Sequence, residues 1–203
     1  MPRLADVIDK YFIIRSGGDN MPILARQREG GGRLALALLM NDLGFSRGVE
    51  IGVNHAKSAE MWCQYIPGLE LTAIDPYIVY GHRRSQEKQD AICEEARQKL
   101  AAHGAKLLRA KSADVASSFE DESLDFVHID GNHTFDFAVM DIVQYVPKVR
   151  KGGLVIVHDY CNFQWSGVTQ AVDGYTHCHD IRPWYVTKGR EPTVFWERGA
   201  ERG

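Results

Sequence analysis

The chain has 203 residues, 44% of them hydrophobic, with a formal net charge of −3 and a pI near 6.2. This length and apolar content suit one buried core, and the weakly acidic balance predicts neither nucleic acid nor an anionic membrane as a partner. The four cysteines lack zinc-type spacing, and no apolar run approaches the roughly 18 residues that a transmembrane helix needs. Since the start also lacks a signal-type apolar core, we expect a cytoplasmic protein with reduced thiols.

The first 47 residues differ in pattern from the rest of the chain. They hold an amphipathic start, a glycine-containing break at 17–20, and three glycines at 30–32 before an apolar helix expected over 34–43. Three glycines in a row are typical of a flexible joint between helices, and a loop over a ligand is the alternative. We therefore expect a helical N-terminal extension over 1–47 and one further domain over 48–203.

From residue 48 onward, short β-branched runs alternate with helical patterns, which is typical of a largely parallel α/β sheet. The expected strands cover 48–53, 70–75, 106–110, 124–130 and 154–159, and the expected helices cover 57–65, 85–103, 135–149 and 167–175. A turn at Gly152-Gly153 is expected before the strand over 154–159, and a C-terminal antiparallel hairpin over 182–197. The sequence thus predicts a Rossmann-like, seven-stranded, mostly parallel sheet with helices on both faces.

Two apolar runs in this pattern end in an acid, Asp130 and Asp159. Ligands of open α/β sheets gather at the carboxyl ends of the strands, so both acids are expected at a functional site. His133 follows Asp130 by one short turn, and His158 precedes Asp159. Together these oxygens and imidazoles could hold Mg²⁺ or another divalent cation, although strand alternation points His158 away from Asp159. The competing mechanism needs no metal: His133 is a general base, and Asp130 or Asp159 orients its ring.

The strand over 48–53 leads through a tight turn into a helix, as GVEIGVNHAKS. A glycine there lets the backbone approach a ligand, and the helix end offers unpaired N–H groups. The dinucleotide fingerprint G-x-G-x-x-G is absent. Asp75 ends the next strand, where an acid can accept hydrogen bonds from the two hydroxyls of a ribose. The alternative is that Asp75 caps a helix or turn ahead of Pro76.

The chain resembles class I S-adenosylmethionine-dependent methyltransferases in a set of motifs that occur in one order, over about residues 48–197. The branch that it resembles more narrowly is the small-molecule O-methyltransferases with I-D-G-x-H and H-D-Y motifs. The motifs are Glu50-Ile-Gly52, Ile74-Asp75-Pro76, Ile129-Asp130-Gly131 with His133, Gly152-Gly153, and His158-Asp159-Tyr160. One departure is Ala56, where the first loop of the family usually has another glycine.

The resemblance implies S-adenosylmethionine as the cofactor. Glu50 would organise the first turn, Gly52 would face the methionine half, and Asp75 would bind the ribose. The remaining cofactor contacts would come from Asn54, Ser58, Asp130, Ser112 and Asp114. For Ser112 and Asp114, the start of a helix is an equally acceptable explanation.

The predicted reaction is methyl transfer to a hydroxyl of a small molecule. Asp130, His133 and Asp159 are the expected catalytic residues, and Asp130, Asp159 and His158 the expected ligands of a cation. Loops over 77–84 and 161–165, which hold tyrosines, arginines and a tryptophan, could form the acceptor pocket. A homodimer is a separate expectation. One rival is an NAD-dependent Rossmann oxidoreductase, which predicts the missing G-x-G-x-x-G. Others are a catalytically silent nucleoside-binding module, disfavoured by the intact acids, and a methyltransferase for protein or nucleic acid.

Overall fold

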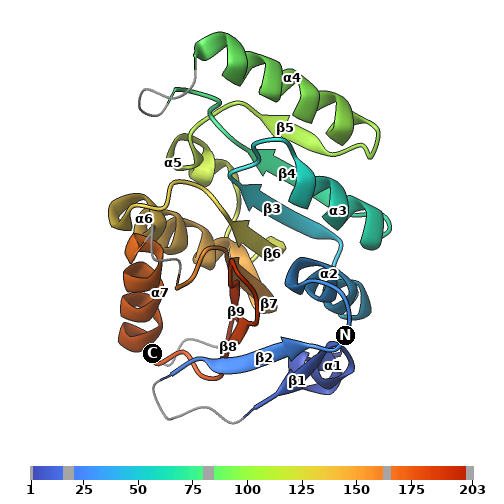
Figure 1. The fold of residues 1–203 in the computed structure, drawn as a ribbon, viewed down its shortest axis with the longest axis vertical. Helices are drawn as coiled ribbons and strands as arrows, with labels where there is room; N and C mark the ends of the chain where they lie inside the picture. The colour runs from blue at the N-terminus through green and yellow to red at the C-terminus, as the bar shows by residue number, and fades with distance from the viewer. Residues whose placement is uncertain (1, 16–20, 80–84, 162–165, 200–203) are drawn as a thin grey trace.

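The computed structural model describes residues 2–15, 21–79, 85–161 and 166–199, and within them nine strands form one sheet (Figure 1). The strand order is β1-β2-β8-β9-β7-β6-β3-β4-β5. The strands are β1 Phe12–Ile14, β2 Ile23–Gln27, β3 Arg47–Ile51, β4 Glu70–Ile74, β5 Lys106–Leu108, β6 Leu124–Ile129, β7 Val149–Val157, β8 Trp184–Thr187 and β9 Val194–Glu197. Strands β7, β6, β3, β4 and β5 run parallel, and β9 pairs antiparallel with both β7 and β8. The predicted fold class and the C-terminal hairpin are confirmed.

Helices cover both faces of the sheet, as predicted. They are α1 Leu4–Tyr11, α2 Gly32–Asp42, α3 Lys57–Tyr65, α4 Gln86–Ala101, α5 Ser112–Val115, α6 Phe135–Tyr145 and α7 Ser166–Cys178. Helices α1 to α4 form one core with Phe126 and Ile156, while α6 and α7 form the other core with Val127 and Val155. Successive strand residues face opposite cores because β-strand side chains alternate. In the part of the chain that is described, no helix has the length and apolar character to cross a membrane.

The N-terminal segment is not helical throughout, which corrects the sequence-based expectation. Strands β1 and β2 form an antiparallel hairpin, and β2 pairs in parallel with β8, so the sheet has nine strands and not seven. The apolar runs of both strands were too short to separate strand from helix by their periodicity. Leu36 and Leu39 of α2 share a core with Trp62 and Phe126. The division of the chain at residue 47 stays a prediction.

Gly152 and Gly153 lie inside β7, which begins at Val149, and do not form the predicted turn. A Cβ on Gly153 would lie 2.4 Å from the carbonyl oxygen of Asp125, and the register between β6 and β7 shifts between Leu124 and Phe126. The two glycines therefore let β7 bulge against β6.

Gly48 tests how tightly the centre of the sheet is packed. A Cβ on this residue would lie 2.3 Å from the ring of Phe126, which is fully buried. We expect Gly48→Ala to lower the free energy of unfolding by about 3 kcal/mol, because a filled core has no room to yield. Gly174, within α7, has nothing within 4 Å of an added Cβ, so Gly174→Ala should raise stability by about 0.5–1 kcal/mol. Urea unfolding checks both values, and equal stability of the two variants would contradict this packing.

Asp125 of β6 joins the amino ends of β3, β6 and β7 through hydrogen bonds. Its carboxylate accepts hydrogen bonds from the backbone N–H groups of Ser46 (2.7 Å) and Arg47 (2.9 Å) and from Nε of Arg150 (2.6 Å). Burial alone would raise the pKa of this carboxyl, but these donors outweigh it and hold the pKa below its ordinary value.

A pH-dependent loss of stability follows from this lowered pKa. The stabilising contribution is present above the unfolded-state pKa of about 4 and is lost as pH falls through the folded-state pKa. We expect Asp125→Asn to lower the free energy of unfolding by about 2–3 kcal/mol at neutral pH. The difference from wild type should shrink as the pH is lowered below about 4. Urea unfolding across this range checks the prediction, and a difference that does not vary with pH would contradict it.

Candidate active site

A cavity of about 740 Å³ opens at the carboxyl ends of β3, β4 and β6. This is the edge of the sheet where ligands of α/β folds bind. Seven of the sequence-predicted site residues line the cavity: Gly52, Asn54, Ser58, Asp75, Ser112, Asp130 and His133. The others, Glu50, Asp114, His158 and Asp159, do not line it.

The turn between β3 and α3 forms one wall of the cavity. Its backbone geometry explains why small residues occupy positions 52 and 56. Gly52 has a φ of 82°, and a Cβ there would lie 2.0 Å from the carbonyl oxygen of Asp130. The glycine thus lets the ends of β3 and β6 approach each other. Ala56 is also left-handed, with a φ of 57°, which shows why a glycine would suit this position.

Asp75 holds this turn in place. Its Oδ2 accepts hydrogen bonds from the backbone N–H groups of Val53 and Asn54, both at 2.9 Å, and Oδ1 accepts one from Tyr77 at 2.8 Å. The carboxylate therefore does the organising that was expected of Glu50. Each of its oxygens has two lone pairs, so Asp75 can still accept from a ligand in the cavity.

Glu50 instead lies buried beneath the turn, on β3. Its Oε1 is 3.7 Å from Nδ1 of His128, a fully buried residue on β6 that packs against the edge of Trp62. Burial raises the pKa of Glu50, and His128 opposes that rise. Glu50 thus supports the core below the cavity and does not reach the turn.

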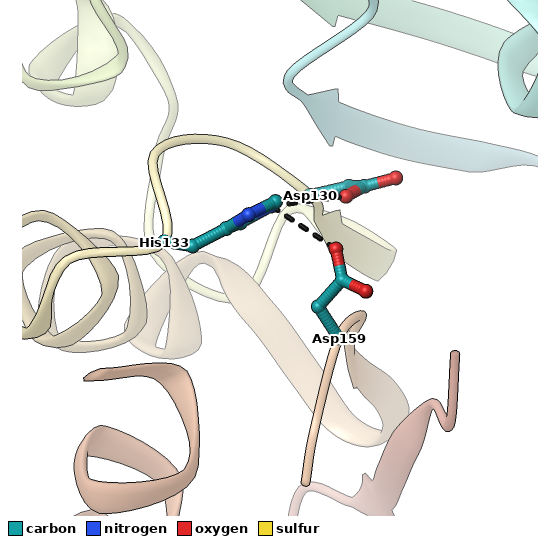
Figure 2. Close-up of side chains that lie close together, drawn as sticks. All are labelled: Asp130, His133 and Asp159. Atoms are coloured by element: carbon teal, nitrogen blue, oxygen red, sulfur yellow. Dashed lines mark ion pairs between the residues drawn. The ribbon is translucent and has the colours of Figure 1, made fainter. Parts of the chain in front are cut away.

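Asp130, His133 and Asp159 form what we call the acid–histidine cluster. Nε2 of His133 lies 3.2 Å from Oδ2 of Asp159 and 3.6 Å from Oδ1 of Asp130, so the ring sits between the ends of β6 and β7 (Figure 2). Burial opposes ionisation of Asp130, but His133 and His158 beside it hold its pKa well below the ordinary value. One donor atom from each member of the cluster lies within 4.8 Å of the others, a spacing that one metal ion can span.

His158 lies behind the cluster. Its Nδ1 is 3.5 Å from Asp130 and 3.4 Å from Asp159, so the strand end does bring it to the same side as the acids. Burial lowers the pKa of His158, but the two neighbouring carboxylates outweigh burial and raise the pKa to about 9. The predicted third metal ligand is thus close to the acids, yet the metal-sized group contains His133 in its place.

Arg33 is a site residue that the sequence analysis missed. It is the second residue of α2 and lines the cavity, with Nη2 at 2.8 Å from Nε2 of His158 and 3.5 Å from Oδ2 of Asp130. This 2.8 Å contact needs a lone pair on Nε2, so it forms only when His158 is neutral with its hydrogen on Nδ1, and the charge of Arg33 opposes the rise in the pKa of His158. The only local sign was the run of three glycines just before it.

Arg33 also places a fixed positive charge where a divalent cation would compete for Asp130. Two unit charges about 4 Å apart interact by about 4 kcal/mol at an effective dielectric constant near 20. We therefore expect Arg33→Met to bind Mn²⁺ at least about tenfold more tightly than wild type. The exposed Arg26 supplies the control Arg26→Met, which should leave Mn²⁺ binding unchanged in calorimetry. Equal Mn²⁺ affinity in Arg33→Met and wild type would contradict this competition.

Ser112 and its surroundings form the far wall of the cavity. The Ser112 hydroxyl donates to Oδ1 of Asp141, and the Tyr145 hydroxyl donates to the Ser112 carbonyl at 2.8 Å. Asp114 is exposed, so the acid at this wall is Asp141 of α6. Asp141 was overlooked although it shares the buried side of its helix with Ala138, Ile142 and Tyr145. The predicted acceptor-pocket residues at 80–84 and 162–165 lie outside the described residues.

The sheet-end cavity, with an acid that fixes the first turn, is the arrangement of an α/β enzyme that uses a nucleotide-type cofactor. Residues 49–160 match the family described as a methyltransferase domain. Because this match covers more than half of the chain, the chain belongs to that family. The predicted methyltransferase family is thereby confirmed.

Comparison with individual proteins adds likeness at lower identity. One uncharacterised protein of Sinorhizobium fredii, y4gI, is 26% identical over 121 residues, which are 55% of this chain and 13% of that protein. Another, R132 of Acanthamoeba polyphaga mimivirus, is 25% identical over 124 residues, which are 58% of this chain and 53% of that protein. The chain thus spans about half of one relative and a small part of the other. The O-methyltransferase TomG from Streptomyces achromogenes, solved with S-adenosylmethionine, superposes with a TM-score of 0.61 at 17% identity, covering 82% of this chain and 79% of TomG.

Proposed function

We propose that this chain transfers the methyl group of S-adenosylmethionine to a hydroxyl of a small molecule. The observation that carries the proposal is that one cavity is lined both by the turn fixed by Asp75 and by Asp130 and His133 of the acid–histidine cluster. The turn fixed by Asp75 suits a nucleoside, and the acid–histidine cluster suits an acceptor that must lose a proton. TomG, an O-methyltransferase with S-adenosylmethionine bound, has a similar fold.

The cofactor would lie along the carboxyl ends of β6, β3, β4 and β5. Asp75 would accept hydrogen bonds from the ribose, with Asn54 and Ser58 beside it. Ser112 would lie next to the adenine base. Helix α3 begins at Lys57, which itself lines the cavity, and would offer its open N–H groups to the carboxylate of the methionine half. The sulfonium would then face Asp130.

His133 is the proposed general base. Asp159 beside Nε2 favours the tautomer with its hydrogen on Nε2, and Nδ1 then carries the lone pair that accepts the acceptor's proton. The acceptor oxygen attacks the methyl carbon in line as the carbon–sulfur bond breaks, which leaves S-adenosylhomocysteine and a methyl ether. The sulfonium is already activated, so alignment and deprotonation are the work left to the protein.

A divalent cation is the second candidate, favoured by the metal-sized spacing of the acid–histidine cluster. Asp130, His133 and Asp159 would hold it, and it would lower the pKa of a bound hydroxyl as a Lewis acid. In that case His133 is a ligand and not a base. Arg33 weighs against this candidate because its charge lies 3.5 Å from Asp130.

A transfer assay with trideuteromethyl S-adenosylmethionine tests the proposal. We expect mass spectrometry to show a gain of one trideuteromethyl group on an acceptor from a panel of catechols, phenols and sugars, with S-adenosylhomocysteine formed in equal amount. Full activity after exhaustive EDTA treatment would favour His133 as the base, and loss restored by Mg²⁺ or Mn²⁺ would favour the cation. Labelling of protein or nucleic acid alone would overturn the small-molecule acceptor.

A cytoplasmic location and a homodimer also belong to the proposal and rest on sequence alone. Light scattering of the purified chain checks the second, since a dimer has twice the 22.9 kDa of one chain.

A further inference from the structure

Arg33 carries hydrogen-bond donors at the cavity that the described part of the protein does not use. The side chain is 34% exposed and lines the cavity, as do Asp130 and His133. Its contacts with described residues involve Nη2 alone, which lies near His158 and Asp130. Nε is buried, and neither Nε nor Nη1 hydrogen-bonds to any residue that the structure describes. An arginine has five N–H donors in a rigid fork, so most of this fork is left for a ligand.

The start of α2 fixes the position of Arg33. A Cβ on Gly32, the residue before it, would lie 3.2 Å from the side chain of Thr187 on β8 and 3.3 Å from Nε2 of Gln27 on β2. The helix therefore begins in close contact with two strands, which a glycine permits. Arg33 also lies outside residues 49–160, the part that matches the methyltransferase family. Its place at the cavity is thus a feature of this chain that the family match does not account for.

The contact between Arg33 and Asp130 is too long to occupy the guanidinium. Nη2 is 3.5 Å from Oδ2 of Asp130, whereas hydrogen bonds between a cation and a carboxylate are usually about 2.7–2.9 Å. Asp130 also has His158 at 3.5 Å and His133 at 3.6 Å. The positive charge of Arg33 therefore lies beside the acid–histidine cluster without a closely paired carboxylate among the described residues.

A single carboxylate group separates Arg33 from the proposed general base. Oδ2 of Asp130 faces Arg33, and Oδ1 of the same residue faces His133. One small ring could therefore place its hydroxyl at His133 and an anionic substituent at Arg33. A carboxylate matches the guanidinium fork with two parallel hydrogen bonds. A phosphate fits less well, because its charge of about −1.5 to −2 would lie near the acids of the cluster with one arginine to offset it.

We propose that Arg33 binds a carboxylate of the acceptor, so that the molecule methylated is a hydroxylated carboxylic acid. This inference rests on the proposed function, because it assumes that the acceptor hydroxyl lies at His133. The cofactor also has a carboxylate, but the amino end of α3 is the place proposed for it. Arg33 approaches Asp130 and His158, which follow or end β6 and β7, on the side of the acceptor. Arg33 is thus a residue that determines acceptor specificity.

Two matched pairs of acceptors test the inference: 3,4-dihydroxybenzoate with 3,4-dihydroxybenzamide, and glucuronate with glucuronamide. Each amide keeps the hydroxyls and removes the charge. With saturating S-adenosylmethionine, we expect wild type to show a kcat/KM about 10- to 100-fold higher for at least one acid than for its amide, the difference that one hydrogen bond to a charged group makes. In Arg33→Gln this preference should fall below about threefold. The control Arg26→Gln should keep it, since Arg26 is exposed and does not line the cavity.

The outcomes separate this inference from the function beneath it. If wild type binds S-adenosylhomocysteine but prefers neither acid to its amide, the inference is overturned and the methyltransferase proposal stands. An unchanged preference in Arg33→Gln would also overturn it, because another group would then bind the carboxylate. Arg33→Gln that weakens S-adenosylhomocysteine as much as it weakens the acid would assign Arg33 to the cofactor and likewise overturn it.

The proposed function itself fails if wild type binds neither S-adenosylmethionine nor S-adenosylhomocysteine in calorimetry, and the inference then fails with it. Because the absence of a preference in wild type is decisive alone, the test holds even if Arg33→Gln does not fold.

Discussion

Replacing His133 with glutamine is expected to lower kcat by about 10²- to 10⁴-fold, the usual contribution of a positioned general base. Glutamine keeps hydrogen-bonding capacity near Asp159 but cannot take up a proton at neutral pH. His133 is not among the residues proposed to hold the cofactor, so the Kd for S-adenosylhomocysteine should stay within about threefold of wild type. Single-turnover kinetics with saturating cofactor, together with calorimetry, measures both quantities.

The exposed residue His103 supplies the control for this prediction. His103→Gln makes the same chemical change outside the cavity and should retain wild-type kcat. A His133→Gln enzyme with kcat within about threefold of wild type would contradict a base or ligand role for this residue. The further variant Asp159→Asn should also lower turnover far more than cofactor affinity, because Asp159 lies 3.2 Å from Nε2 of His133 and is not among the cavity-lining residues.

Replacing Asp75 with asparagine is expected to weaken binding of S-adenosylhomocysteine by about 100-fold. The carboxylate accepts three backbone hydrogen bonds through its two oxygens, and the amide would turn an NH₂ group toward one set of N–H donors. Each hydrogen bond to a charged group contributes about 1.5–3 kcal/mol, so the β3–α3 turn should lose its order together with the ribose contact.

Calorimetry of Asp75→Asn checks this loss, with Asp9→Asn as the control because Asp9 is exposed and far along the chain from the turn. At saturating cofactor, kcat of Asp75→Asn should remain within about tenfold of wild type, since the acid–histidine cluster is intact. Wild-type affinity in Asp75→Asn would show that Asp75 is only a turn residue, which was the alternative left open by its sequence.

The part of the site that follows strand ends could be predicted from the sequence. Asp75, Asp130 and Asp159 each close an apolar β-branched run, and parallel strands bring such ends to one edge whatever the details of packing. A small residue could be predicted at position 52, but the structural reason for a glycine there could not. The structure shows that a side chain at this position would collide with the backbone of Asp130, which lies 78 residues further along the chain.

The contributions of helices could not be predicted in the same way. Arg33 reaches His158 from α2, a helix that precedes the alternating part of the chain, and no local pattern connects the two. Asp141 reads in the sequence as one polar position on an amphipathic helix, and only its contact with Ser112 marks it as part of the cavity. The N-terminal strands were missed for a related reason: β2 is stabilised by pairing with β8, about 160 residues later, and not by its own pattern.

Calorimetry of the purified chain with S-adenosylmethionine, S-adenosylhomocysteine and NAD tests the central claim most directly. The cavity at the Asp75 turn should bind the two adenosyl ligands with Kd values of about 1–100 μM, in the range usual for enzyme substrates, and should give no heat with NAD. Tight binding of NAD without binding of S-adenosylmethionine or S-adenosylhomocysteine would contradict the account and favour the NAD-dependent oxidoreductase instead.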